Sequence, residues 1–269
     1  MKKNRIFIFI AIFLIIFVLP VFTPSYKAVA VSSSEKQLPA SEHIIYGYPS
    51  TTDTILYRKG YVLDHDNNKK VAVWVSYHLT DKYLVKNVNR SDDFRPDPDL
   101  PKGQRAELID YKKSGYDKGH LVPAEDMRRE EKTESESFLL SNMTPQIGPK
   151  FNRGIWKELE AKVRRWVKQR KDIYVIAGPI YESQNYKTIG PNKVAVPTAF
   201  YKIIVSCNYN GKDIDAIAFI LPNKPIPSKK LANYITTIDE VEKETGLDFF
   251  HDLEKQTETK LEAQKSPMW

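Results

Sequence analysis

A helical pattern in residues 152–168 constrains the fold of this chain most strongly. Trp156, Leu159, Val163 and Trp166 recur at the spacing of one helix face, and charged residues fill the other faces. Such a helix needs an apolar surface to cover. Strand-like runs that could build this surface occupy residues 56–63, 71–79, 173–177, 199–206 and 214–221. Because strands and helices do not alternate regularly, the pattern predicts an α+β fold.

Turn and cap residues mark the limits of several elements. Residues 64–68 have turn chemistry, so the runs on either side of them read as a hairpin. Residues 89–103, rich in Pro and Asp, are expected to form a loop. Thr237-Ile238-Asp239-Glu240 is a capping box that opens a helix, and Gly246 is placed to end it. Residues 255–269 are mostly polar and are expected to form a frayed tail.

The N-terminus reads as a targeting segment. A basic start precedes the apolar residues 6–19, and Ala28-Val29-Ala30 forms a cleavage-type site. We therefore expect a signal peptide over residues 1–30 with cleavage after Ala30, a flexible spacer over residues 31–43, and one domain over residues 44–254. The alternative is an uncleaved membrane anchor, because the apolar run approaches spanning length.

Charge and cysteine content narrow the function only slightly. The chain of 269 residues has a formal charge of +7, but its first thirty residues hold four of the 41 basic side chains and no acidic ones. The remaining +3 favours a polyanionic substrate only if the positive charges cluster. Cys207 is the only cysteine, so an internal disulfide is excluded, and its strand-like surroundings indicate a core thiol.

Candidate catalytic residues follow the predicted hairpin. His120 comes after Asp117-Lys118-Gly119, where a glycine permits a tight backbone. Asn152 reads either as the N-cap of the long helix or as a neutral oxygen ligand for Mg²⁺. Glu160 is either a solvated helix charge or a group that holds water near a metal. Arg90 is either a surface arginine or a bidentate phosphate clamp.

Taken in order, these segments resemble the DNA/RNA non-specific endonuclease family, the ββα-metal nucleases. Asp117-Lys118-Gly119-His120 is similar to the family's Asp-Arg-Gly-His signature. Further matching segments run from Tyr46 to Leu253: Tyr46-Gly47-Tyr48-Pro49, Arg90-Ser91, Ser141-Asn142-Met143-Thr144-Pro145-Gln146, Asn152, Trp156 to Glu160, Val196 to Lys202, Leu221-Pro222-Asn223 and Thr245 to Phe250. The resemblance implies a central, mostly antiparallel sheet flanked by helices, with His120 and Asn152 in a ββα-metal unit.

The resemblance also implies a role for each candidate. His120 would be the general base, Asn152 the direct protein ligand of Mg²⁺, and Glu160 the residue that orients a water of the metal's shell. Arg90 would contact the phosphate, and Asn142 would support His120 or its loop. Lys118 departs from the family, because arginine is usual there and lysine lacks the bidentate fork.

These expectations describe an exported endonuclease that cleaves DNA and RNA through the phosphate backbone to 5′-phosphorylated products. Its cofactor would be Mg²⁺, with Mn²⁺ as the alternative ion. Three rivals remain: a phosphodiesterase of small nucleotides, a membrane-held nuclease for DNA entry, and a non-catalytic binder of extracellular DNA. A membrane partner is expected only if the N-terminal segment stays uncleaved.

The export hypothesis makes a direct prediction. The apolar run and the Ala-x-Ala site predict that the exported protein begins at Val31. N-terminal sequencing of protein from the culture medium checks this. Full-length chain found only in the membrane fraction would instead support the anchor.

Overall fold

The computed structural model describes residues 38–51, 54–207, 214–227 and 230–269. The proposed signal peptide and most of the spacer lie outside these residues. Everything below concerns the compact unit Ala40–Trp269. Within the described part of the chain, no helix has both the length and the apolar character needed to cross a membrane.

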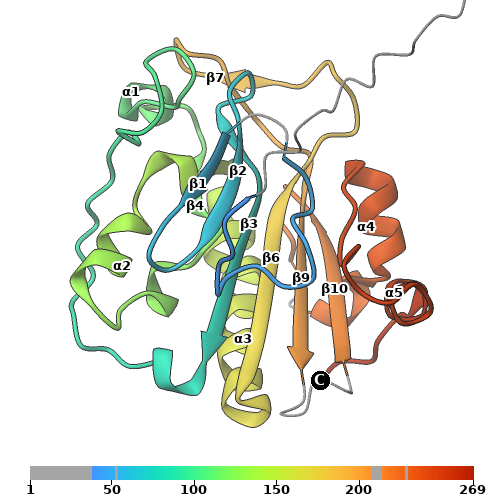
Figure 1. The fold of residues 1–269 in the computed structure, drawn as a ribbon. Coiled ribbons are helices and arrows are strands. Elements are labelled where there is room, and N and C mark those ends of the chain that lie inside the picture. Colours follow the sequence, from blue (N-terminus) through green and yellow to red (C-terminus); the bar gives the residue numbers. More distant parts are fainter. Residues whose placement is uncertain (1–37, 52–53, 208–213, 228–229) are drawn as a thin grey trace, which may run out of the picture. The chain divides into compact units, whose positions relative to one another are not determined.

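A seven-stranded antiparallel sheet forms the centre of this unit (Figure 1). Each strand pairs antiparallel with its neighbours, as predicted. The strands, in spatial order, are β1 (Thr54–Tyr57), β2 (Val62–Asp66), β3 (Val71–Thr80), β6 (Asp172–Ile180), β9 (Ala199–Cys207), β10 (Ile214–Pro222) and β11 (Ile235–Thr236). The three central runs of apolar residues predicted from sequence are thus β6, β9 and β10.

Helices cover both faces of the sheet, so successive strand residues enter two different cores. On β6, Val175 packs in the same cluster as Trp166 of α3 (Lys157–Arg170). The next residue, Ile176, packs with Ile238 of α4 (Ile238–Thr245) and Leu261 of α5 (Lys255–Ala263). In Figure 1, α3 passes behind the sheet and α4 and α5 lie beside β10. The result is three layers, and the α+β prediction is confirmed.

Smaller elements build the end of the domain that carries the candidate site. The hairpin of β4 (Asp117–His120) and β5 (Met143–Gln146) is separate from the main sheet. A third apolar cluster joins β5 to a second short hairpin, β7 (Thr188–Ile189) with β8 (Val194–Ala195). Two short helices, α1 (Leu108–Tyr111) and α2 (Glu131–Glu136), flank this region. With α3, the β4–β5 hairpin gives the expected ββα arrangement.

The long helix begins five residues later than the sequence pattern predicts. Residues Gly148–Trp156 form a widened, kinked turn before α3. Pro149 is extended, Lys150 has a φ of 63°, and Gly154 leaves helical geometry at φ −128° and ψ −110°. The apolar spacing of Trp156 and Leu159 still places both in one core, so periodicity alone could not reveal the interruption.

The predicted turn at residues 64–68 is partly wrong. Strand β2 continues to Asp66 through a bulge between Asp64 and His65. His65, which lies in the predicted turn where a polar side chain is expected at the surface, is fully buried, and its Nδ1 lies 3.1 Å from Asn67 Oδ1. A β-bulge lets a polar run continue in the ladder, which turn propensity does not anticipate.

The C-terminal segment is not a frayed tail, so that prediction is also wrong. It contains α5, and its last residue packs on α3: Trp166 Nε1 donates to the Trp269 carbonyl at 2.9 Å, and the Arg170 guanidinium lies 3.6 Å from the Trp269 ring. The helix expected at Thr237 is confirmed. The Thr237 hydroxyl accepts from Glu240 N at 3.1 Å, and Gly246 ends α4 in the left-handed region.

Candidate nucleic-acid cleavage site

One cleft brings together most of the predicted site residues. It lies between the β4–β5 hairpin, the start of α3 and the loop before α1, and has a volume of 760 Å³. Its lining includes five of the six candidates: Arg90, Lys118, His120, Asn152 and Glu160. The sixth, Asn142, does not line the cleft. Segments 70 residues apart in sequence therefore meet in one place.

His120 ends β4, and its imidazole packs against two aromatic rings that also contact each other. The edges of Phe94 and Phe138 approach it, with ring centroids 5.6 Å and 5.0 Å away. Its Nε2 is buried and has no hydrogen-bond partner among the described residues. Burial, followed by the charges of Arg90 and Lys118, lowers the pKa of His120 to about 3. The ring is therefore neutral at pH 7, with a nitrogen free to accept a proton.

Asn142 holds the backbone at Val122, two residues after His120, through side-chain hydrogen bonds. Its Oδ1 accepts from Val122 N at 3.0 Å. Its Nδ2 donates to the carbonyls of Val122 and Ser137 at 3.0 and 2.8 Å. The amide thus satisfies buried backbone groups and fixes the loop, and its three hydrogen bonds go to Val122 and Ser137 rather than to the imidazole. Of the two supports considered from sequence, the structure has the one through the loop.

Asn152 lies inside the kinked turn, and its side chain does not cap α3. Instead, its Nδ2 donates to Asp117 Oδ2 at 2.9 Å. This contact commits the amide nitrogen, so Oδ1 is the atom that remains for a ligand in the cleft. Asp117 Oδ1 accepts from Arg153 at 3.3 Å, which anchors the same carboxylate from a second side. The geometry therefore disfavours the cap and leaves a hard oxygen donor.

Positive charge lies beside the imidazole. The Arg90 guanidinium stacks 4.7 Å from the Phe138 ring centroid, and its Nε donates to Asp92 at 2.7 Å. The Lys118 ammonium lies 4.5 Å from the Phe94 ring centroid. Two aromatic rings thus hold the imidazole and the two cations together, and Arg90 is also ion-paired with Asp92.

Glu160 faces the cleft above a network of buried charges. Arg164 donates to Asp126 at 2.8 Å, and Lys202 of β9 is fully buried with its Nζ 4.4 Å from the Trp156 ring centroid. Lys202 also donates to the carbonyl of Leu121, the residue after His120, at 3.4 Å. Burial raises the pKa of the Glu160 carboxyl and lowers that of the Lys202 ammonium. Two acidic and two basic side chains therefore compensate one another's charge beneath the site: Glu160, Asp126, Arg164 and Lys202.

Several of these residues were not identified from sequence. Asp117 and Lys202 lie inside motifs that the sequence singles out, but neither was assigned a role. A carboxylate three residues before the candidate base was a usable signal for Asp117. Lys202 carried another signal, because a lysine within an otherwise apolar strand needs a buried partner. Asp126 and Arg164 had no distinguishing pattern.

Gly119 is required for space rather than for an unusual backbone angle. A Cβ at this position would collide with the buried side chain of Gln146 on the paired strand β5. The sequence suggested that Gly119 permits a tight backbone, whereas the structure shows that glycine is needed because a side chain would collide with Gln146. The glycine lets the two strands that carry His120 and Gln146 approach closely.

The other histidines are structural. His43 is buried with Nε2 3.1 Å from the Lys59 carbonyl, although sequence placed it in the flexible spacer. His78 pairs with Asp172 at 2.7 Å, and His251 Nε2 lies 3.2 Å from the Tyr48 carbonyl. Cys207 is half-buried, and burial raises the pKa of its thiol, which argues against a reactive role.

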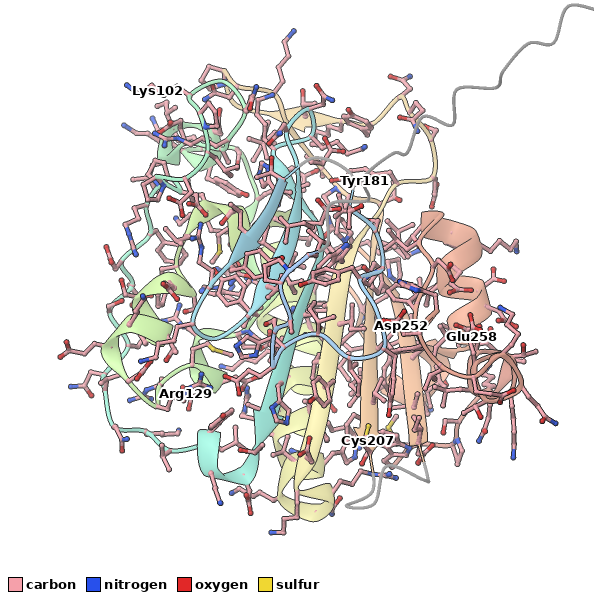
Figure 2. The ribbon with its side chains drawn as sticks, in the orientation of Figure 1. Lys102, Arg129, Tyr181, Cys207, Asp252 and Glu258 are labelled. Atoms are coloured by element: carbon pink, nitrogen blue, oxygen red, sulfur yellow. The ribbon has the colours of Figure 1, made fainter. Side chains whose placement is uncertain are left out.

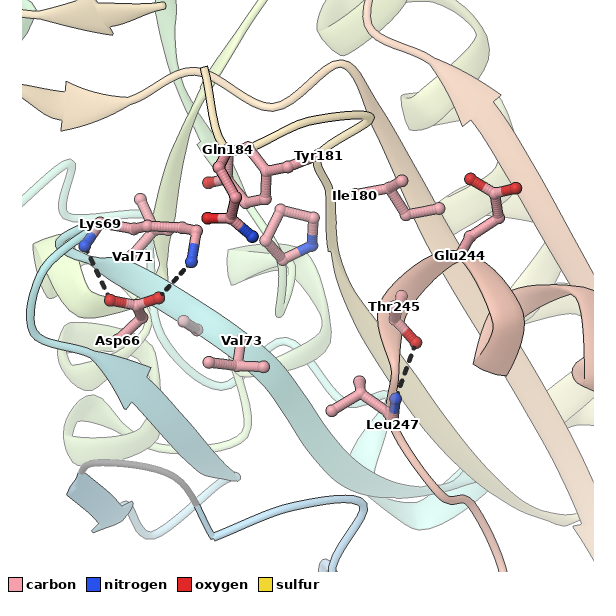
Figure 3. Close-up of a pocket in the computed structure, with 12 residues that line it drawn as sticks. Asp66, Lys69, Val71, Val73, Ile180, Tyr181, Gln184, Glu244, Thr245 and Leu247 are labelled. Atoms are coloured by element: carbon pink, nitrogen blue, oxygen red, sulfur yellow. Dashed lines mark hydrogen bonds and ion pairs between the residues drawn. The ribbon is translucent and has the colours of Figure 1, made fainter. Parts of the chain in front are cut away.

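A second hollow lies away from these groups, between the β2–β3 hairpin and the end of α4 (Figure 3). Its volume is 210 Å³, and Lys69 donates to Asp66 within it at 2.7 Å. None of its lining residues is a predicted site residue. The larger cleft is therefore the candidate active site.

Comparison with known proteins agrees with this geometry. Residues 39–256 match the DNA/RNA non-specific endonuclease family. Nuclease C1 of Cunninghamella echinulata var. echinulata is 39% identical over 232 residues, covering 81% of this chain and 92% of that protein. Mitochondrial endonuclease G of Caenorhabditis elegans is 34% identical over 239 residues, covering 84% and 77%.

A solved structure shares the fold as well. A chain from the crystal structure of the EndoG/EndoGI complex matches with a TM-score of 0.73 at 36% identity, covering 78% of this chain and 91% of that chain. The family match spans most of the sequence and nearly all of the compact unit. This chain is a nuclease that belongs to the DNA/RNA non-specific endonuclease family.

Proposed function

We propose that this nuclease is an exported endonuclease that hydrolyses phosphodiester bonds of DNA and RNA with Mg²⁺ and leaves 5′-phosphorylated ends. The observation that carries the proposal is the single cleft that contains a neutral imidazole, an amide oxygen and two cations. Export rests on the N-terminal sequence alone.

His120 acts as the general base. The imidazole, which lines the cleft, takes a proton from water, and the resulting hydroxide attacks phosphorus in line with the leaving 3′ oxygen. The P–O3′ bond breaks, and the 3′ oxygen takes up a proton from solvent. Burial, and then the neighbouring cations, lower the pKa of His120, so the imidazole is neutral and in its working form throughout the neutral pH range.

The donor atoms fit Mg²⁺, and Mn²⁺ has the same preferences. Mg²⁺ keeps several waters and accepts few protein ligands, all of them oxygen. Asn152 Oδ1 would supply one neutral ligand, and the Glu160 carboxylate in the same cleft would accept hydrogen bonds from surrounding water. When bound, the cation would stabilise charge on the phosphoryl oxygens and the leaving oxygen.

Substrate preference follows from the character of the cleft. Arg90, Lys118, Arg153 and Lys157 give it positive charge. The Arg90 and Arg153 side chains are 44% and 64% exposed, so the rim is open to a long polyanion. This favours a polymer over a small nucleotide. Contacts to phosphate alone carry no base sequence, which suits a non-specific enzyme.

Two rivals from the sequence remain distinguishable. The base and the oxygen donor lie in one cleft, which disfavours a non-catalytic binder. A membrane-held DNA-entry nuclease would keep the same chemistry and differ only at the N-terminus. The proposal therefore has separate tests for catalysis and for export.

Circular plasmid tests the catalytic assignment, because only an endonuclease can cut DNA that has no ends. His120→Ala should cut at least ~10²-fold more slowly than wild type in Mg²⁺ while binding DNA normally, because the base is lost. His251→Ala, which removes a partly exposed histidine remote from the cleft, is the matched control and should cut normally. Cutting by folded His120→Ala at the wild-type rate would contradict the role of His120.

The position that departs from the family is tested in the same assay. Lys118→Ala should slow cutting, because the cation beside His120 is lost. Lys118→Arg should cut at least as fast as wild type, because a guanidinium adds the bidentate fork. Equal rates for all three proteins would show that this cation does not assist the reaction.

The Asn152–Asp117 contact makes a separate prediction about stability. Asn152→Asp places a second carboxylate where the nitrogen now lies 2.9 Å from Asp117 Oδ2. We expect Asn152→Asp to be less stable than Asn152→Ala at pH 7 by about 1 kcal/mol, with Arg153 screening part of the repulsion. Adding Asp117→Asn should restore stability by reversing the hydrogen bond, but should not restore cutting.

Urea unfolding of wild type, Asn152→Asp, Asn152→Ala and the double variant Asn152→Asp/Asp117→Asn measures how the stability of Asn152→Asp depends on Asp117. Plasmid cutting by the same four proteins is measured in parallel. A capping role makes a different forecast, because aspartate caps about as well as asparagine. Wild-type stability in Asn152→Asp, independent of Asp117, would therefore support the cap and remove the argument for an oriented amide oxygen.

A further inference from the structure

Acidic side chains gather between α4 and α5, on the face of the sheet opposite α3. Asp239 and Glu242 are three residues apart on α4, and Glu258 and Glu262 are four apart on α5, so each pair shares one face of its helix. Figure 2 labels Glu258 on α5 beside α4. The ligand atoms of Asp239, Glu242 and Glu262 all lie within 4.8 Å of one another.

Glu262 supplies an independent observation. Its side chain is buried, with 6% of the residue exposed, and its Oε1 has no hydrogen-bond partner among the described residues. Burial, and then the charges of Glu242, Glu258 and Asp239, raise the pKa of Glu262 to about 8. A buried carboxylate oxygen without a hydrogen-bond partner is costly, and three like charges add to that cost.

The nearby lysines pair with other carboxylates, so Lys255 offsets the charge of Glu262 only in part. Lys255 lies 3.0 Å from Glu258, with 81% of its own side chain exposed. Lys243 pairs instead with Glu240 on the outer side of α4. Glu242 uses Oε1 to accept from Phe249 N at 2.7 Å, which leaves its other oxygen available. The cluster therefore presents several oxygen atoms and an excess of negative charge.

We propose that Asp239, Glu242 and Glu262 form a Ca²⁺ site between α4 and α5. Two oxygens bound to one Ca²⁺ at 2.3–2.6 Å can lie no more than ~5 Å apart, a limit that the three groups meet. Ca²⁺ accepts several carboxylates in irregular geometry, whereas Mg²⁺ favours one or two with a rigid octahedron. The donor set therefore favours Ca²⁺.

The site would act on stability rather than on cleavage. α4 and α5 pack in the core cluster that contains Ile238, Val241 and Leu261, whereas α3 and Trp156 belong to the cluster on the other face. Bound Ca²⁺ would clip the C-terminal helix to α4. Because the proposed site shares no residue with the cleft, it does not rest on the nuclease mechanism.

Calorimetric titration and thermal unfolding of the full protein with CaCl₂ test the site. Wild type, Glu262→Gln and Glu244→Gln are compared, because Glu244 is an exposed glutamate on the same helix outside the cluster. Any Ca²⁺ bound in the cleft contributes equally to all three. Wild type and Glu244→Gln should bind one more Ca²⁺ than Glu262→Gln. Added CaCl₂ should also raise their unfolding temperatures by more than it raises that of Glu262→Gln.

The metal-free proteins give a second readout. Without Ca²⁺, Glu262→Gln should unfold at a higher temperature than wild type, because the raised pKa means that Glu262 must either take up a proton on folding or carry a buried charge, and glutamine does neither. Asp239→Asn, a milder change at an exposed position, should fold normally and weaken Ca²⁺ binding at least about tenfold. Plasmid cutting in Mg²⁺ should be unchanged in every variant, which separates this site from the cleft.

Two results would overturn the proposal. One is an equal Ca²⁺ response in wild type and Glu262→Gln. The other is a Glu262-dependent gain in unfolding temperature that equimolar Mg²⁺ produces to the same extent as Ca²⁺. If the acids merely share a proton, Ca²⁺ will have no effect at the cluster and Glu262→Gln will lose stability at neutral pH.

Discussion

The Asp117 carboxylate is the contact on which the geometry of the cleft depends. It joins β4, which also carries His120, to the kinked turn that carries Asn152. No side chain fits on the adjacent Gly148, because its Cβ would lie 2.7 Å from both Asp117 oxygens. The base and the proposed ligand are therefore held by one carboxylate, with Arg153 supplying its counter-charge.

Beneath this contact, the buried ions position groups rather than add stability. Removing two charges from water costs about what their attraction returns, so a network of this kind is weak evidence of stabilisation. The role of this network is to orient groups around the cleft. Lys202 reaches from the central sheet to the carbonyl after His120, and Arg164 holds Asp126 under the cleft. The sheet thus extends its rigidity to the reacting groups.

Much of the fold followed from local patterns in the sequence. Apolar runs located β6, β9 and β10, and the Thr237 cap located α4, because each signal is carried by neighbouring residues. The late start of α3 escaped prediction because Gly154 breaks the helix without disturbing the apolar period. His65 and the C-terminal segment were misjudged for a shared reason: tertiary packing on distant residues buried polar stretches.

The candidate site likewise has one part that the sequence predicted and one part that only the folded structure shows. The order of the motifs along the chain identified five side chains that line one cleft. Because these residues are far apart in sequence, only the family resemblance could predict that they meet. The partners that orient them are set by the folded arrangement. Asp117 reaches a residue 35 positions away, and Lys202 contacts one 81 positions away. No spacing rule anticipates such pairs.

The central claim is that the Asn152 amide oxygen holds the cation beside a neutral His120. Electron paramagnetic resonance of bound Mn²⁺, used as a substitute for Mg²⁺, tests this directly. Glu262→Gln serves as the background, so that the α4–α5 cluster does not contribute. The account predicts that this protein binds one Mn²⁺, that His120→Ala retains it, and that Asn152→Ala loses it or binds it far more weakly. Undiminished Mn²⁺ binding by folded Asn152→Ala would contradict the account.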